Sequence, residues 1–155
     1  MLDLDLDLIR LNENLKAVRN ILAAEPTDRA ELNSIKAVLE ANLKELGRCA
    51  RSGNCLESTD PCSFLESYSK HCFYYAVVLD KLGEWETVEE FAYTAAFIYP
   101  RYDEEYYDAC QSIWQRAMVK RGFAPTLTIK EFFKEKHPEL NNCAERLAYF
   151  LKYLP

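Results

Sequence analysis

The chain has 155 residues, of which 49% are apolar and 13% aromatic, and its formal net charge at pH 7 is −6. This length fits one domain, and the small numbers of glycine (4) and proline (6) exclude a disordered chain and disfavour a turn-rich β-protein. The negative charge repels nucleic-acid phosphates and anionic lipid headgroups, so we expect neither nucleic acid nor a membrane as a partner.

The N-terminal residues alternate between apolar and acidic side chains from Leu2 to Leu8. A secretory signal would be basic and then continuously apolar, and no stretch reaches the roughly 18 apolar residues that a membrane span needs. We therefore expect a cytoplasmic protein whose cysteines are mostly thiols. Cys72, Cys110 and Cys143 fall on apolar helical faces and are expected to be small core residues.

Two amphipathic helices are predicted first. Apolar residues recur at three- and four-residue steps from Leu4 to Leu22, Pro26 ends this helix, and the same spacing resumes at Leu32 and continues to Gly47. Residues 1–47 are expected to form an antiparallel helical hairpin. The heptad-like apolar stripe of residues 4–22 also allows an alternative, a homo-oligomer in which this stripe packs against a second copy.

Residues 48–60, a stretch rich in Gly, Ser and Asn, are predicted to be a cysteine-containing loop. Asp60 and Pro61 then open a third helix that ends at Gly83. Four more helices are expected, over residues 85–99, from Asp103 to before Gly122, from Thr128 to before Pro138, and from Asn142 onward. The sequence thus predicts one all-α domain of about seven helices, in which residues 61–155 form a helical bundle.

Small and aromatic residues have a distinctive spacing over residues 69–102: Gly83 at a turn, Trp85 just after it, then Ala95 and Pro100. These four residues match the register of the tetratricopeptide family, a 34-residue helix-turn-helix, and the segment resembles one degenerate repeat of that family. Other positions of the repeat hold apolar or small residues, namely Cys72, Tyr75, Ala76, Leu79, Val88 and Ala92. The resemblance implies a solenoid-like packing of the bundle, and an ordinary helical bundle is the alternative.

The resemblance also implies a recognition surface, because the first helix of each tetratricopeptide unit lines a concave groove. The matching positions on the third and fifth helices are Lys70, Phe73, Tyr74, Val77, Lys81, Tyr107, Gln111 and Trp114. Since Tyr and Trp dominate interface hot spots, this face is expected to bind a protein partner. The alternative is that these aromatic residues belong to the core.

Residues that commonly bind zinc cluster in one part of the chain, namely Cys49, Cys55, Cys62, His71 and Cys72. The gaps between the three loop cysteines are wider than the two to four residues typical of a structural zinc site. Two alternatives stay open: a disulfide that joins Cys55 to Cys49 or to Cys62, and a redox-responsive thiol near Arg48 and Arg51.

No motif of an enzyme is visible, since the chain has 2 histidines and no glycine-rich phosphate loop. We therefore expect a non-enzymatic adaptor or inhibitor-like module that binds a protein partner without a cofactor. The alternatives are a zinc-binding or redox-responsive module built on the cysteine cluster, and a structural homo-oligomer.

Overall fold

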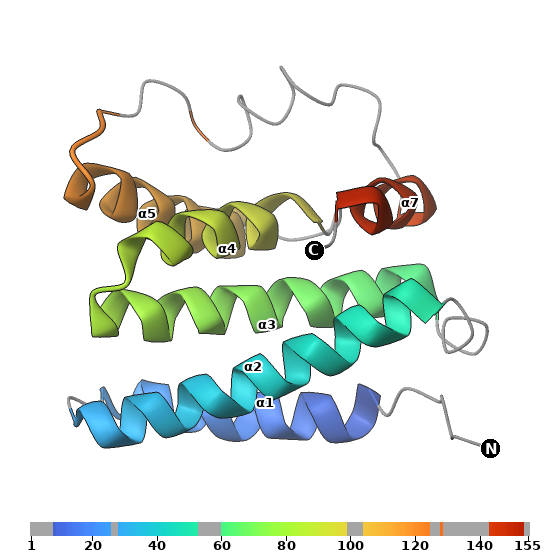
Figure 1. The fold of residues 1–155 in the computed structure, drawn as a ribbon, viewed down its shortest axis with the longest axis horizontal. Helices are drawn as coiled ribbons and strands as arrows, with labels where there is room; N and C mark the ends of the chain where they lie inside the picture. Colours follow the sequence, from blue (N-terminus) through green and yellow to red (C-terminus); the bar gives the residue numbers. More distant parts are fainter. Residues whose placement is uncertain are drawn as a thin grey trace.

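The computed structural model describes residues 8–25, 28–52, 60–98, 104–124, 128 and 143–153. These residues form six α-helices and no β-strand (Figure 1), which confirms the all-α prediction. The helices are α1 (Leu8–Ala23), α2 (Arg29–Ser52), α3 (Pro61–Leu82), α4 (Trp85–Ile98), α5 (Glu104–Lys120) and α7 (Cys143–Tyr153). About seven helices were predicted, and the described residues contain six of them. The remaining one, predicted from Thr128 to before Pro138, lies almost entirely outside the described residues. None of the described helices combines the length and apolar character that a membrane span needs.

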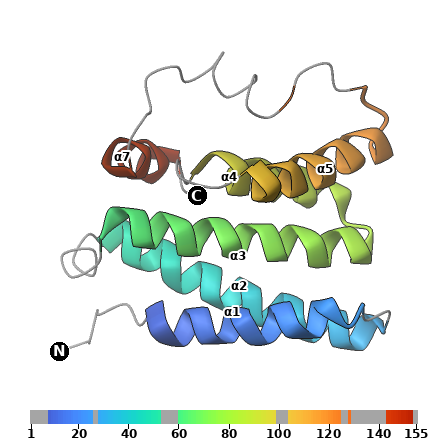
Figure 2. The same ribbon diagram turned by 180° about the vertical axis from the view of Figure 1, so that it is seen from behind.

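Helix α3 is the centre of the bundle and contacts each of the other five described helices. Helices α1 and α2 lie on one side of it, and α4, α5 and α7 lie on the other, as two opposite views show (Figures 1 and 2). Its sequence explains this position, because buried residues such as Ala76, Val78 and Leu79 spread over a wide arc of the helix rather than along one narrow stripe.

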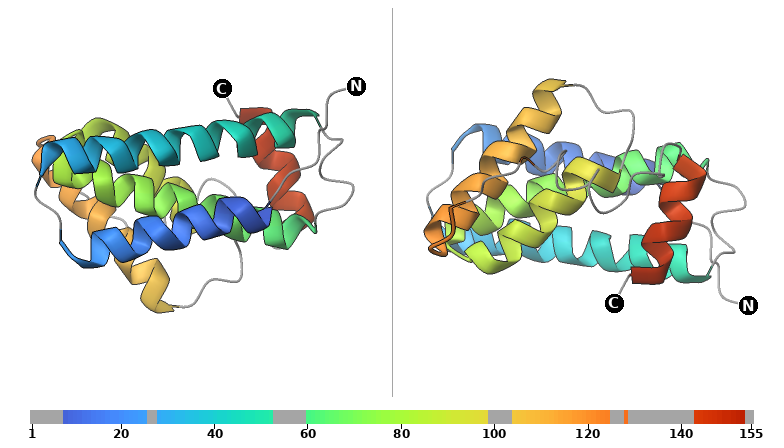
Figure 3. Two further views of the ribbon diagram at one scale, coloured as in Figure 1. Left: turned by 90° about the horizontal axis from the view of Figure 1, so that it is seen from below. Right: turned by 90° about the horizontal axis from the view of Figure 1, so that it is seen from above.

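Helices α1 and α2 lie side by side and run in opposite directions (Figure 3). The apolar stripe of α1 consists of Leu11, Leu15, Val18 and Leu22, each at most 8% exposed. It belongs to the core that α1 shares with α2 and α3. This part of the stripe is therefore covered within one chain, and a homo-oligomer would need a different surface.

Helix α2 extends beyond the boundary that the sequence suggested at Gly47. It continues to Ser52, and Cys49 and Ala50 carry the apolar spacing onward with 1% and 2% of their surface exposed. A glycine that ends a helix usually has a positive φ, which Gly47 does not have. The prediction of a loop from residue 48 is therefore wrong for residues 48–52, while 53–59 lie outside the described residues.

Helices α3 and α4 form the tightest pair. Asp60 caps α3 by accepting a hydrogen bond from the Ser63 backbone N–H at 3.2 Å. At the other end Gly83 has a φ of 79°, a left-handed conformation that favours glycine, and it turns the chain into α4. Ala76 on α3 and Ala95 on α4 are both fully buried, and such small residues let two helix backbones approach closely.

Helix α7 packs on α3 and α4 and is tied to α3 by a disulfide between Cys62 and Cys143. The two Cα atoms are 5.2 Å apart, although the residues are separated by 81 positions in the sequence. Cys49 is disulfide-bonded as well. The prediction of thiols is therefore wrong for these three cysteines, and so is the alternative that Cys62 pairs with Cys55. A bond between such distant residues leaves no local spacing pattern in the sequence.

Candidate binding groove

One face of α3 carries most of the residues predicted to bind a partner. Lys70, Phe73, Tyr74, Val77 and Lys81 recur at three- and four-residue steps, so the helix aligns them in one stripe. The two lysines are exposed and the three residues between them are half-buried. This stripe is therefore partly open to solvent.

The predicted binding residues on α5 lie deeper. Trp114 and Gln111 are 7% and 9% exposed, and Trp114 is part of the hydrophobic core. Tyr107 is half-buried, and its hydroxyl donates to the Gln111 side-chain oxygen at 3.3 Å. The structure thus places Trp114 and Gln111 beneath the surface, where they are largely covered.

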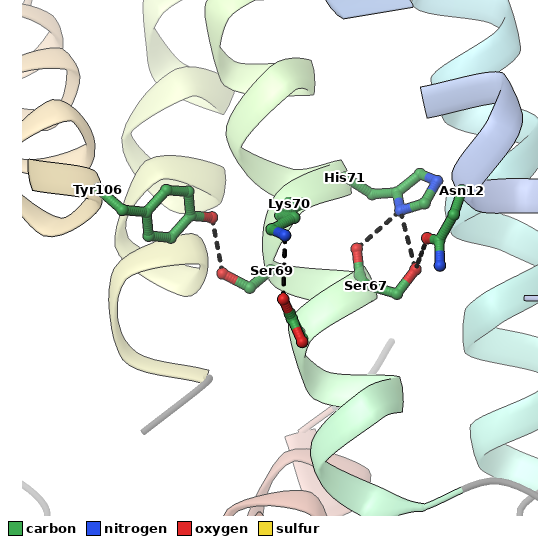
Figure 4. A network of polar contacts seen from close by, with 7 residues as sticks. Asn12, Ser67, Ser69, Lys70, His71 and Tyr106 are labelled. Carbon is green, nitrogen blue, oxygen red and sulfur yellow. Dashed lines mark hydrogen bonds and ion pairs between the residues drawn. The ribbon is translucent and has the colours of Figure 1, made fainter. Parts of the chain in front are cut away.

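Tyr106 is the α5 residue that meets the α3 stripe. Its ring centroid lies 5.4 Å from that of Phe73, which in turn lies 5.1 Å from that of Tyr74. The Tyr106 hydroxyl is 2.7 Å from the Ser69 hydroxyl, which donates to the Ala95 carbonyl at 2.6 Å, so Tyr106 donates to Ser69 (Figure 4). The sequence analysis did not include Tyr106 among the binding residues; its position four residues before the buried Cys110 on the same helix is the local sign that it faces inward.

A groove of about 560 Å³ opens between α1 and α3 and reaches α5. Its walls combine charged, polar and aromatic side chains from three helices that are distant in sequence. They include Asn12, Lys16 and Arg19 of α1, Glu66, Lys70 and Tyr74 of α3, and Tyr106 of α5. Two of the predicted residues, Lys70 and Tyr74, therefore line a real depression.

A polar network adjoins this groove, since two of its members, Asn12 and Ser67, also line the groove (Figure 4 shows their contacts). The Ser67 hydroxyl donates to the Asn12 side-chain oxygen at 2.7 Å. The His71 Nδ1–H donates to the Ser67 carbonyl at 2.7 Å. Its Nε2 accepts from the Asn42 amide at 3.2 Å. His71 is 0% exposed, and both of its ring nitrogens are used in the neutral form. The network links α1, α2 and α3 next to the groove.

The stability of the fold is expected to fall in mild acid because of His71. Burial lowers the pKa of His71, an effect that the Ser67 and Leu11 backbones partly oppose. As the pH falls through the unfolded-state pKa of about 6.5, His71 binds a proton in the unfolded chain but stays neutral in the folded chain. The free energy of unfolding should then decrease, by at most about 1.4 kcal/mol per pH unit for one proton.

Urea unfolding between about pH 7.5 and about pH 5.5 measures this loss. The His71→Gln variant is the control, because the glutamine amide can still donate and accept hydrogen bonds at this position but does not titrate. Its stability should change less over the same interval, and an equal change in both proteins would assign the acid sensitivity to other groups.

A second, smaller groove of about 330 Å³ lies between α2, α3 and α4. Tyr75 and Phe91 form its aromatic part, with ring centroids 4.7 Å apart. Burial and the neighbouring Glu40 raise the pKa of Tyr75 to about 12, so its hydroxyl stays protonated at neutral pH. This groove contains none of the predicted binding residues.

The predicted zinc ligands point in different directions. Cys49 and Cys62 are in disulfides, and Cys55 lies outside the described residues. His71 faces the polar network, while Cys72 is a free, fully buried thiol whose pKa is raised well above its ordinary value by burial. Within the described segments, no three side chains of His, Cys, Asp or Glu converge on a point that could hold a metal ion.

A comparison with known protein families, curated proteins and solved structures finds no significant match to this chain. The groove offers a recessed surface on which aromatic rings are partly buried and cationic side chains are exposed.

Proposed function

We propose that the protein is a non-enzymatic protein-protein interaction module, an adaptor or inhibitor, that binds its partner through the groove between α1 and α3. The observation that supports this proposal best is the partly exposed stripe from Lys70 to Lys81 along one wall of a depression of about 560 Å³. A depression of this size is in the range of ligand-binding sites.

The aromatic side chains support a role in binding because they are held in place before any partner arrives. Phe73 lies between Tyr74 and Tyr106, and Tyr106 is fixed by its hydrogen bond to Ser69. Half-buried, pre-organised aromatic residues lose little conformational entropy on binding, which favours them as anchors of an interface.

The resemblance to a tetratricopeptide repeat stays part of the proposal. It is supported by the antiparallel α3–α4 pair, the left-handed Gly83 between them and the buried Ala76 and Ala95. In a repeat of this kind the exposed face of the first helix, which corresponds to α3, is the one that binds.

Replacing Tyr74 with alanine is expected to abolish capture of the partner without unfolding the protein. The tagged native chain, Tyr74→Ala and Tyr93→Ala are used side by side for affinity capture from a native lysate. Tyr93 is a matched control, because it is also half-buried and loses the same side chain but lies on α4, outside the groove. One partner captured by the native chain and Tyr93→Ala, but not by Tyr74→Ala, is the expected result. Equal capture by all three, with circular dichroism showing that all are folded, would move the binding surface elsewhere.

A redox-responsive module is the second candidate, and the Cys62–Cys143 disulfide is the observation that favours it. This disulfide also bears on the location of the protein, since such bonds persist mainly in oxidising compartments and are rare in the cytoplasm that the sequence suggested. Trapping thiols in intact cells with an alkylating reagent, followed by mass spectrometry, decides between the cytoplasm and an oxidising compartment. Alkylated Cys62 and Cys143 would support the cytoplasm, and a protected pair would support an oxidising compartment.

A further inference from the structure

We propose that the groove between α1 and α3 accepts an acidic segment of the partner protein, whose carboxylates meet Lys16, Arg19 and Lys70 while an apolar side chain packs on Tyr74. This inference rests on the proposed function and specifies the chemistry of the partner at the same site.

The cationic rim of the groove comes from two helices. Lys16 and Arg19 are three residues apart on the exposed face of α1, and Lys70 stands on α3 across the groove. The described part of the chain offers no carboxylate that forms an ion pair with Lys16 or Arg19. The positive charges of Arg19 and Lys70 also act together on Tyr74, since they oppose the rise in its pKa that burial causes. Arg19 and Lys70 therefore both act on this one aromatic side chain, and Lys16 lines the same groove.

The acidic residues of the groove leave this positive rim available. Glu66 forms an ion pair with Lys70, with Nζ and Oε1 3.0 Å apart, and the two side chains are 44% and 49% exposed. Such a surface pair one helical turn apart is weak, so a carboxylate of the partner can compete with Glu66 for Lys70. Glu13 also lines the groove, and among the described residues it forms no ion pair with Lys16 or Arg19.

The contrast between this rim and the whole chain indicates a short acidic ligand. The protein has a net charge of −6, so its overall field repels a long polyanion such as a nucleic acid. A peptide with a few carboxylates can place them at the rim without extending over the remaining negative surface. Charge complementarity of this local kind gives specificity and speeds association.

The size and lining of the groove indicate a peptide rather than a small anion. A volume of about 560 Å³ holds several side chains. Its walls include Leu8, the half-buried Tyr74 and Tyr106, and Ser63. Such a surface is matched by a segment that carries both acidic and apolar residues.

Selection from a random peptide library displayed on phage, with the full-length protein as bait, tests this inference. Peptides enriched by the native chain should contain an excess of Asp and Glu together with apolar residues. A synthetic peptide from this pool should then bind Arg19→Glu at least about tenfold more weakly than the native chain, because one charge-assisted contact is replaced by repulsion.

The matched control is Arg48→Glu, since Arg48 is exposed on α2 outside both grooves. Each substitution lowers the net charge by two, from −6 to −8, so the field of the whole protein changes equally. The peptide should bind Arg48→Glu as it binds the native chain. Equal weakening by both variants, enrichment of neutral or basic peptides, or equal binding of an oligonucleotide would each overturn the inference.

The outcome separates this inference from the proposed function. If no acidic peptide is enriched and the native chain still captures a partner through Tyr74, the partner is a protein of other chemistry and only the inference is wrong. The opposite outcome is that no partner is captured from the lysate in a Tyr74-dependent way, while acidic peptides bind and depend on Arg19. In that case the groove binds acidic peptides as inferred, and the proposed capture of a protein partner through Tyr74 is wrong.

Discussion

Replacing Trp114 with alanine is expected to lower the free energy of unfolding by about 3–5 kcal/mol. The indole is 7% exposed and belongs to the core beside α3, so its removal leaves a cavity that the surrounding helices fill only in part. Chemical denaturation with urea measures the loss. For a single domain whose total stability is of order 5–15 kcal/mol, the variant will be marginally folded.

Two further variants make this experiment decisive. Trp114→Phe retains much of the aromatic volume and should lose less stability than Trp114→Ala. Val119→Ala is the matched control on the same helix, because Val119 is 62% exposed, and its free energy of unfolding should change by no more than about 0.5 kcal/mol. A stable Trp114→Ala variant that fails to bind a partner would show instead that Trp114 acts at the interface, as the sequence suggested.

Removing the Cys62–Cys143 disulfide is expected to lower the free energy of unfolding by about 3–4 kcal/mol. The bond closes a long loop, since the cysteines are separated by 81 positions in the sequence, and cross-links of long loops restrict the unfolded chain most. In a chain of this size the change corresponds to a decrease in Tm of roughly 6–16 °C. The double variant Cys62→Ser/Cys143→Ser is the one to measure, since it leaves no unpaired thiol at either position.

The comparison should be made with and without a reducing agent. Under oxidising conditions the native chain should be more stable than the double variant, and with the bond reduced this difference should largely disappear. Reduction of the disulfide at Cys49 affects both proteins equally. A difference that persists in the reducing agent would show that the stability comes from side-chain packing at Cys62 and Cys143 rather than from the covalent bond.

The helical elements could be predicted from the sequence because they depend on local signals. Asp60, Pro61 and Gly83 delimit α3 as expected, since capping side chains and a left-handed glycine act within one turn. The prediction that α2 ends at Gly47 failed because the continuation of this helix depends on tertiary packing. Glycine is compatible with a helix interior when the residues on both sides of it are packed, and the burial of Cys49 and Ala50 shows that they are.

The site could be predicted only in part, because its two walls come from helices that the sequence does not place together. The periodicity of α3 was enough to align Lys70 with Tyr74 in one stripe. Which residue of α5 would meet that stripe depends on the rotation of α5 about its axis, and the structure selects Tyr106. Arg19 lines the groove because α1 packs against α3, and no local sequence pattern specifies how these two helices pack.

The central place of α3 limits how the protein can be dissected. All five other described helices pack on this one element, so no cut in the chain yields two pieces that each keep a complete set of neighbours. A fragment that ends after α3 would expose the side that α4, α5 and α7 cover, and a fragment that begins after α3 would lack the helix that its members share. The bundle is therefore indivisible, and a minimal binding fragment smaller than the whole helical array would have to replace α3 with another scaffold.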